Sequence, residues 1–314
     1  MTRAIVYTEI GSPDVLHLIE TPDPLATSGE VVVRIEAAGV NPIDAKLRSG
    51  KRASKPITEP RPVGYDGAGV IEALGDDVEG FALGDRVAIR DTVGTYASSL
   101  VVPVRNLAVL PDSVTTAEGA GIGIPAGTAY QALRSLGVGA GDALLVHAGS
   151  GAVGQAAVQF AVAWGATVIA TASPARHDQL RELGAIPVSY SPGLLERVRE
   201  AAPGGITVAL DCAGSDEAIE ASLELVSDRD RIATIVRGAD AAGFGIRGFQ
   251  GGSPIPLTEE ELAWRAEALP KTIELLASGD FTIELGPELP LAEAARAHEL
   301  VESGATAGKI ILIP

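Results

Sequence analysis

A single cysteine, Cys212, is present among the 314 residues of the chain. One thiol can form no intramolecular disulfide and cannot supply a zinc site built from several thiolates. Basic residues are few as well, since 24 Lys and Arg stand against 41 Asp and Glu, and the formal net charge is −17. A negative field of this size repels phosphate backbones and anionic lipid surfaces. The composition therefore argues against nucleic-acid and membrane partners, and the lone cysteine fits a reducing, cytoplasmic compartment.

Long apolar segments are scarce too. The N-terminus, MTRAIVYTEIG, lacks the apolar core of a signal peptide. One uncharged stretch, between Asp142 and Arg176, is long enough to span a membrane. Four glycines and two glutamines interrupt it, so its continuous helical part measures only about three turns. A buried strand–helix–strand explains this stretch better.

The length suggests two domains, at roughly 100–200 residues each. The first part predicts an irregular β-barrel, because no helical period of comparable length occurs before about residue 115. Short β-branched runs there are separated by clusters of Pro, Gly, Asp and Ser. The predicted strands cover residues 3–8, 15–20, 30–38, 68–74, 86–89, 95–102 and 108–110.

From residue 143 strands and helices alternate, which predicts a doubly wound parallel sheet. The predicted strands are 143–147, 167–172, 187–190, 207–211 and 231–237, and the helices between them are 155–165, 176–185, 194–202 and 216–226. The loop 238–256 should form a cleft wall or a sheet edge. In the tail we expect a helix over 258–279 interrupted at Pro270, a strand over 281–285, a helix over 291–304 and a last strand from Lys309.

A glycine-rich loop follows the predicted strand 143–147 directly and opens a helix. Its sequence, Gly149-Ser150-Gly151-Ala152-Val153-Gly154, fits G-x-G-x-x-G. The first glycine permits the turn, the second lets a pyrophosphate approach the backbone, and the third allows helix–strand packing. This strand–loop–helix context predicts a dinucleotide site. The alternative is a glycine-rich turn that binds nothing.

The end of the next strand indicates which dinucleotide binds. NAD sites place an acid there for the ribose hydroxyls. In this chain no acid lies between the end of that strand at Ala172 and Asp178. Ser173 can donate to a phosphate, and Arg176 can bind one with two hydrogen bonds. These residues favour the extra phosphate of NADPH, although Arg176 could instead simply begin a solvated helix.

Several motifs together resemble the medium-chain dehydrogenase/reductases, in particular the zinc-independent quinone oxidoreductase branch that includes zeta-crystallin. The resemblance covers essentially the whole chain. It is carried by GVNPID (39–44), GYDGAGVI (64–71), GDRV (84–87), the glycine loop with His147 before it, and ATAGKIIL (305–312).

The resemblance implies a GroES-like β-barrel domain over residues 1–122, to which residues 258–314 return, and a Rossmann domain over 123–257. It implies an active site in the cleft between them, NADPH as cofactor, and a homodimer joined through the Rossmann sheets. The implied activity is hydride transfer to quinones or activated α,β-unsaturated carbonyls. The alternatives are an enoyl-thioester reductase and a non-enzymatic NADPH-binding protein.

The resemblance also assigns residues. Asn41 would contact the coenzyme or substrate and Asp44 would orient Asn41, the alternative being a structural Asx turn. Thr128 would lie near the nicotinamide phosphates, unless it is a helix cap. Tyr190 would lie beside the adenine-side phosphate, unless it is buried at its strand end.

The departures from the zinc-dependent members predict that no metal is bound. Those members have a Cys near the position of Asn41 and a His-Glu pair where this chain has Tyr65-Asp66, and their cysteine-rich structural lobe is missing here. Without partner bases in the sequence, Cys212 is expected to be a buried inert thiol and His147 a core residue.

Overall fold

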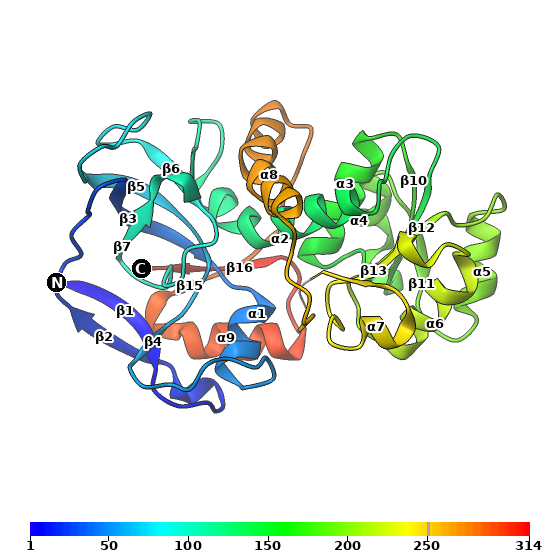
Figure 1. Ribbon diagram of the computed structural model, residues 1–314, viewed down its shortest axis with the longest axis horizontal. Helices are drawn as coiled ribbons and strands as arrows, with labels where there is room; N and C mark the ends of the chain where they lie inside the picture. Colours follow the sequence, from blue (N-terminus) through cyan, green and yellow to red (C-terminus); the bar gives the residue numbers. More distant parts are fainter. Residues whose placement is uncertain (250–251) are drawn as a thin grey trace. The chain divides into compact units, whose positions relative to one another are not determined.

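The computed structural model describes residues 1–249 and 252–314. The chain forms two units, which are described one at a time (Figure 1). Unit 1 consists of Met1–Ile124 and Leu269–Pro314, and unit 2 of Pro125–Ala268. The C-terminal segment thus rejoins unit 1 at Leu269, later than the predicted residue 258. A unit dominated by antiparallel strands and a unit with a parallel sheet agree with the predicted order of β-domain and alternating strands and helices.

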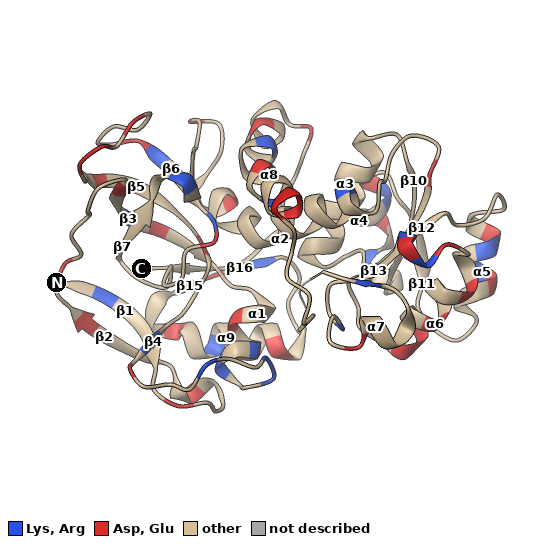
Figure 2. Ribbon diagram, viewed as in Figure 1, with Lys and Arg blue, Asp and Glu red and all other residues tan. Residues whose placement is uncertain are grey.

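The negative charge inferred from composition is distributed over both units (Figure 2). Helix α6 (Asp216–Leu225) carries four acids and no base, and helix α8 (Glu259–Ser278) begins with three consecutive glutamates. Acidic residues also occur along the strands and loops of unit 1. The negative charge therefore belongs to both units rather than to one acidic segment.

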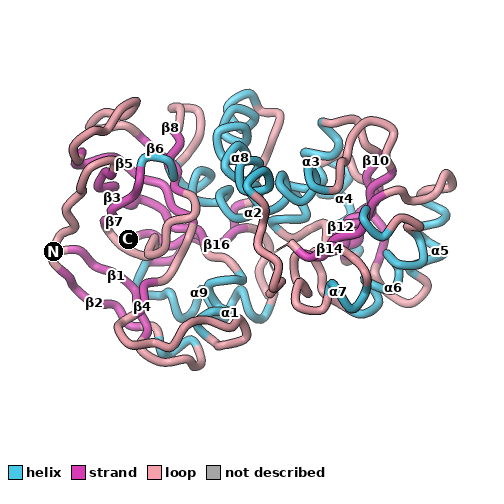
Figure 3. The backbone as a smooth tube through the Cα atoms, in the orientation of Figure 1, coloured by secondary structure: helices cyan, strands magenta, loops and turns pink. Residues whose placement is uncertain are grey.

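Unit 1 is built on two sheets (Figure 3). A seven-stranded sheet has the order β15-β16-β3-β5-β6-β8, with β7 also paired to β3, and a three-stranded sheet has the order β2-β1-β4. The strands are β1 (Thr2–Tyr7), β2 (His17–Thr21), β3 (Glu30–Gly39), β4 (Arg61–Pro62), β5 (Asp66–Leu74), β6 (Arg86–Ile89), β7 (Ser99–Pro103), β8 (Leu107–Val109), β15 (Leu285–Pro290) and β16 (Lys309–Ile313), and the helices are α1 (Pro42–Arg48) and α9 (Ala294–Ser303).

The centre of unit 1 is the antiparallel pair β3 and β5. Val31, Val33 and Ile35 of β3 are at most 3% exposed and form the core with side chains of β6, β16 and α9. Their alternation with more exposed residues is the period-two pattern that the sequence shows. Gly69 of β5 faces the backbone of β3 so closely that a Cβ there would lie 1.9 Å from the carbonyl oxygen of Arg34. This close approach explains the glycine.

Unit 2 is a six-stranded parallel sheet in the order β11-β10-β9-β12-β13-β14. This is the strand order 3-2-1-4-5-6 of dinucleotide-binding sheets. The strands are β9 (Ala143–His147), β10 (Thr167–Ala172), β11 (Ile186–Ser189), β12 (Val208–Asp211), β13 (Ile232–Thr234) and β14 (Arg247–Gly248), and the further helices are α3 (Ala152–Ala163), α4 (His177–Glu182), α5 (Leu194–Ala201) and α7 (Ala241–Phe244). Helix α2 (Thr116–Ser135) begins in unit 1 and continues into unit 2.

The loop after β13 was expected to form a cleft wall or a sheet edge. Within the described part of this loop, β14 is the edge strand of the sheet and pairs with β13. Residues 250 and 251 of the same predicted loop lie outside the described residues. No helix in the described ranges is long and apolar enough to cross a membrane.

Two expectations for the tail were wrong. Helix α8 is not interrupted at Pro270 but runs through it. Proline removes one backbone donor there, and the burial of Leu269 and Ile273 on the same helix offsets that loss. The strand expected over 281–285 instead begins at Leu285, because the parallel pairing with β16 starts at Lys309. The register of a neighbouring strand, not local propensity, decided this boundary.

Candidate active site

Five polar side chains lie buried together in unit 1, each at most 3% exposed. We call them the polar cluster: Asn41, Asp44, Asp66, Tyr96 and Lys309. They come from the residue before α1, from α1 itself, from the first residue of β5, from the loop before β7 and from the first residue of β16. The cluster therefore joins segments that are far apart in the sequence.

Lys309 holds one half of the cluster together. Its Nζ donates to Oδ1 of Asn41 at 2.5 Å and to Oδ2 of Asp66 at 3.1 Å. The amide nitrogen of Asn41 donates to the same Asp66 oxygen at 2.9 Å and to the carbonyl oxygen of Gly39 at 3.3 Å. The remaining Asp66 oxygen accepts the backbone N–H of Ile124 at 2.8 Å. A buried ion pair with this many additional hydrogen bonds is the kind that proteins tolerate.

Asp44 forms the other half. Its Oδ2 accepts the backbone N–H of Asn41 at 2.8 Å and the hydroxyl of Tyr96 at 3.0 Å. Its Oδ1 accepts no hydrogen bond from the described residues. Burial raises the pKa of Asp44 to about 7, against the opposing effects of the Asn41 N–H and the Lys309 charge. Asp44 therefore carries a proton for part of the time at neutral pH, which lowers the negative charge of the cluster.

Asn41 stands at the N-cap of α1 with extended backbone, and Asp44 occupies the third helical position. The Asp44 side chain satisfies the backbone N–H of Asn41, which is one half of a capping box. Both amide hydrogens of Asn41 are engaged, by Gly39 and Asp66. The structure thus brings the two predicted residues together and gives Asn41 two further partners.

Sequence analysis missed three members of the cluster as site residues: Asp66, Tyr96 and Lys309. The available signal was an acid and a lysine inside two motifs, GYDGAG and ATAGKIIL, that otherwise read as apolar strands. An ionisable residue in a buried strand requires a partner. The partner, however, cannot be identified from spacing, because Lys309 and Asp66 are 243 positions apart.

A catalytic zinc does not fit this donor set. Each Asp66 oxygen already accepts hydrogen bonds, and the Lys309 ammonium lies against Asp66 at 3.1 Å. A cation bound to Asp66 would meet the charge of Lys309. Within the described ranges, no group of three or more His, Cys, Asp and Glu side chains could hold a metal.

In unit 2 the glycine loop leaves the carboxyl end of β9, the first strand of the Rossmann order. The backbone N–H groups of Ala148 and Gly149 donate to the hydroxyl and the carbonyl of Thr171 in β10, at 3.0 and 2.9 Å. Ala148 adopts a left-handed conformation, with φ of 54°. Gly151 and Ala152 are exposed, Ser150 and Val153 are partly exposed, and α3 begins at Ala152. The loop therefore offers exposed backbone at a helix N-terminus, as anion binding requires.

Two glycines of this loop serve different purposes, and their alanine variants are expected to differ. A Cβ at Gly154 would lie 2.3 Å from the carbonyl oxygen of Ala148, whereas one at Gly151 would meet that oxygen at an ordinary 3.5 Å. Gly154→Ala should lower the free energy of unfolding by about 1–3 kcal/mol. Gly151→Ala should change it by less than about 0.5 kcal/mol and still weaken NADPH binding about tenfold or more, because a Cβ at the second glycine of this motif would obstruct the approach of a pyrophosphate to the backbone.

Urea unfolding of the free protein and calorimetric titration with NADPH measure the two effects separately. Each variant is the control for the other. If Gly151→Ala bound NADPH as tightly as the wild type, the second glycine would not line the coenzyme site.

Ser173, Arg176 and Tyr190 follow the carboxyl ends of β10 and β11, on the same edge of the sheet as the glycine loop. A turn in which the Arg176 N–H donates to the Ser173 carbonyl at 2.9 Å keeps these two residues close. Tyr190 is 57% exposed, so the alternative that it is buried at its strand end is wrong. All three residues lie where ligands bind in open parallel sheets.

Thr128 lies inside α2, so the alternative that it caps a helix is wrong. It is 6% exposed, and its hydroxyl accepts a hydrogen bond from the Arg265 guanidinium at 3.1 Å. Its contact with the coenzyme stays a prediction.

A second buried network orders the loops after β12 and β13. Asp211 is fully buried, and its Oδ1 accepts the N–H groups of Ala213 and Gly214 at 2.9 and 2.8 Å. Its Oδ2 accepts the Thr234 hydroxyl at 2.7 Å. This carboxylate lies at the end of β12, beside β9, where the strand order reverses. Sequence analysis did not single it out.

His147 and Cys212 have no catalytic setting. His147 is 1% exposed, its Nε2 lies 3.1 Å from the Ser222 hydroxyl, and burial lowers its pKa to about 4. Burial and the neighbouring Asp211 raise the pKa of the Cys212 thiol. A neutral imidazole agrees with the expected structural role of His147. The Cys212 thiol is protonated, as expected of an inert thiol, but the residue is partly exposed rather than buried as expected.

These observations define a class. A GroES-like β-unit and a dinucleotide-binding sheet in one chain are the architecture of the medium-chain dehydrogenase/reductases. The comparisons with known proteins agree: residues 27–112 match the family described as alcohol dehydrogenase GroES-like domain, and residues 183–312 match the family described as zinc-binding dehydrogenase.

Quinone oxidoreductases resemble the chain over its whole length. The human protein is 33% identical over 337 aligned residues, which cover 100% of this chain and 98% of the relative. The Escherichia coli quinone oxidoreductase, solved in complex with NADPH, superposes with a TM-score of 0.84 at 28% identity over 100% of both chains. A mycobacterial protein, also solved with NADPH, gives 0.84 at 31% identity over 100% of both chains. The chain belongs to the quinone oxidoreductase family.

Proposed function

We propose that this protein is an NADPH-dependent oxidoreductase that transfers hydride to quinones and activated α,β-unsaturated carbonyls without a metal. The observation that carries the proposal is the carboxyl edge of the unit 2 sheet. There the glycine loop, Ser173 and Arg176 follow neighbouring parallel strands, and no acid lies between the end of β10 and Asp178. Two relatives that match the chain over its whole length were solved with NADPH, and they support the choice of coenzyme.

The chemistry favours conjugated acceptors. Hydride arrival leaves a negative charge on the acceptor, which a metal would otherwise stabilise as a Lewis acid. Quinones and α,β-unsaturated carbonyls spread this charge onto an oxygen that hydrogen bonds can stabilise. The donor set around Asp66 and Asn41 does not fit zinc, and it already holds the Lys309 ammonium. An acceptor that delocalises the charge itself is therefore the substrate class that suits this chain.

For Asn41 and Asp44 we propose positioning roles. Asn41 links Lys309 to Asp66, and Asp44 fixes the start of α1 through the backbone of Asn41. For Thr128, Ser173, Arg176 and Tyr190 we propose coenzyme contacts, as we do for the loop from Gly149 to Gly154. The protein's main contribution would then be orientation of the coenzyme and the acceptor.

The direct test measures NADPH oxidation by the purified protein with a panel of quinones, enones and enoyl thioesters. A parallel assay measures NADP⁺ reduction with simple alcohols. We expect turnover of quinones or enones, little or no oxidation of ethanol-type alcohols, and unchanged activity after chelator treatment. Faster reduction of enoyl thioesters than of every quinone and enone would favour the thioester reductase instead. NADPH binding without turnover of any acceptor would favour a binding protein.

A further inference from the structure

One hydrogen-bonded pair of side chains fixes the backbone of two loops at the carboxyl edge of the unit 2 sheet. The hydroxyl of Thr234, the last residue of β13, donates to Asp211, the last residue of β12, at 2.7 Å. The same hydroxyl accepts the N–H groups of Val236 and Arg237 at 3.2 and 3.0 Å. Asp211 also accepts the N–H groups at positions 213 and 214. We call Asp211 and Thr234 the buried pair, since both are 0% exposed.

The two loops that the buried pair holds also pack against each other. Gly214 has φ of 75°, and a Cβ there would lie 2.5 Å from Cγ1 of Val236. Positions 212–215 and 235–237 are partly or fully exposed. The buried pair therefore keeps an accessible stretch of backbone in one arrangement. Binding sites depend on support of this kind from hydrogen bonds behind the contacting groups.

The strand order indicates which part of a coenzyme these loops would meet. A dinucleotide lies across the point where the order reverses, with one mononucleotide on each half of the sheet. The first half, β9 to β11, carries the glycine loop and Arg176, which we propose to hold the pyrophosphate and the 2′-phosphate. The second half begins at β12, beside β9. There the N–H of Cys212 donates at 3.3 Å to the carbonyl of His147, just before the glycine loop.

We propose that Asp211 and Thr234 are positioning residues for the nicotinamide half of NADPH; this rests on the proposed function. Both side chains are fully buried, so they act through the loop backbone that they hold rather than by touching the coenzyme. The adenosine half lies on the other half of the sheet and does not depend on them. Loss of the buried pair should therefore weaken one half of the coenzyme site and leave the other unchanged.

Thr234→Val removes the hydroxyl and nearly keeps the shape of the side chain. Calorimetric titration compares NADPH with adenosine 2′,5′-bisphosphate, which lacks the nicotinamide half. We expect the Kd for NADPH to rise about tenfold, as the loss of a buried hydrogen bond allows. The Kd for the bisphosphate should stay within about twofold of the wild type. A merely structural role would weaken the binding of both ligands alike.

Thr207→Val is the matched control, at the opposite edge of the same strands. The Thr207 hydroxyl donates to Asp142 at 2.8 Å, and these residues immediately precede β12 and β9. Ligands do not bind at this amino edge of a parallel sheet, so both Kd values should stay within about twofold of the wild type. Thr234→Ser keeps the buried hydroxyl and should restore most of the affinity for NADPH.

Gly214→Ala keeps the test decisive if Thr234→Val does not fold. It leaves the buried pair intact and places a Cβ against Val236 at a positive φ, so it should show the same selective loss. A wild type that binds both ligands, with folded variants that lose no affinity or lose it equally for both, overturns the positioning role alone. A wild type that does not bind NADPH overturns the proposed function and this inference together.

Discussion

Lys309→Met is expected to lower the free energy of unfolding by about 3–5 kcal/mol, because it leaves a buried carboxylate without its counter-ion. The Lys309 and Asp66 side chains are 2% and 0% exposed and lie 3.1 Å apart. Asp66 would keep the N–H groups of Asn41 and Ile124, which are uncharged. Urea unfolding followed by circular dichroism measures the loss.

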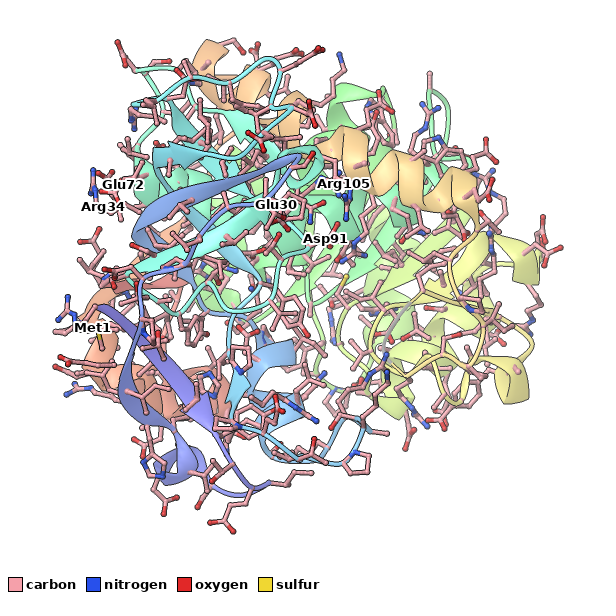
Figure 4. All side chains as sticks on the ribbon, turned by 60° about the vertical axis from the view of Figure 1, so that its left-hand side comes forward. Met1, Glu30, Arg34, Glu72, Asp91 and Arg105 are labelled. Carbon is pink, nitrogen blue, oxygen red and sulfur yellow. The ribbon has the colours of Figure 1, made fainter. Side chains whose placement is uncertain are left out.

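The matched control is an exposed ion pair in the same sheet. Arg34 and Glu72 lie 3.0 Å apart and are each 45% exposed (Figure 4). Arg34→Met should cost no more than about 1 kcal/mol, as exposed pairs generally do. Arg34 also pairs with Glu36 at 2.9 Å, so this variant removes two exposed ion pairs. A larger loss in Lys309→Met, at a nearly equal N···O distance, would therefore show the effect of desolvation.

Two further measurements sharpen the Lys309 result. The double variant Lys309→Met with Asp66→Asn should recover much of the lost stability, since no unpaired charge remains buried. Both tryptophans, Trp164 and Trp264, belong to unit 2, so their fluorescence transition should shift less than the circular dichroism transition. A single variant within about 1 kcal/mol of the wild type would show that the buried ion pair does not support unit 1.

Arg176→Ala is expected to lower kcat/KM for NADPH about 10–150-fold while leaving that for NADH nearly unchanged. The estimate corresponds to one charge-assisted contact, about 1.5–3 kcal/mol. The turn that joins the Arg176 N–H to the Ser173 carbonyl keeps the Arg176 backbone near the end of β10, where the 2′-phosphate is expected. Steady-state kinetics with both coenzymes and one acceptor measure the change.

Arg181→Ala is the matched control for Arg176. Arg181 lies on α4 and pairs with Asp178 at 2.5 Å on the exposed surface. Its removal should change neither coenzyme by more than about threefold, since exposed pairs contribute little. Equal losses for NADPH and NADH in Arg176→Ala would place this residue at a group that both coenzymes share. A wild type that used NADH as well as NADPH would contradict the predicted preference.

Unit 2 could be predicted closely because its signals are local. The central strands β9, β10, β12 and β13 are short apolar runs that are largely buried, and the helices between the strands carry their own period. The strands over 143–147 and 167–172 occur with the predicted bounds as β9 and β10. The glycine loop could be predicted equally well. The turn, the predicted anion contact and the start of the helix all fall within six consecutive residues. Ser173 and Arg176 follow one strand end, so their proximity also needed no distant contact.

Boundaries set by distant partners were not predictable in this way. Pro270 predicted a break in α8, but burial of its neighbours keeps the helix continuous. The strand expected over 281–285 moved to Leu285–Pro290, because its register is set by β16. In both places a tertiary contact outweighed a local preference.

The sequence by itself determined the two-domain fold class, the glycine loop between a strand and a helix, and the expectation that Asn41 and Asp44 belong to a site. Only the tertiary structure decided what those two residues contact. Lys309 donates a hydrogen bond to Asn41, which is 268 positions away in the sequence, and Tyr96 donates one to Asp44, 52 positions away. Such pairings carry no periodic signal, because sheet registers and chain crossings bring them together after folding. A buried lysine in a sequence indicates only that it must have a polar partner. In the folded protein Asp66 and Asn41 are these partners.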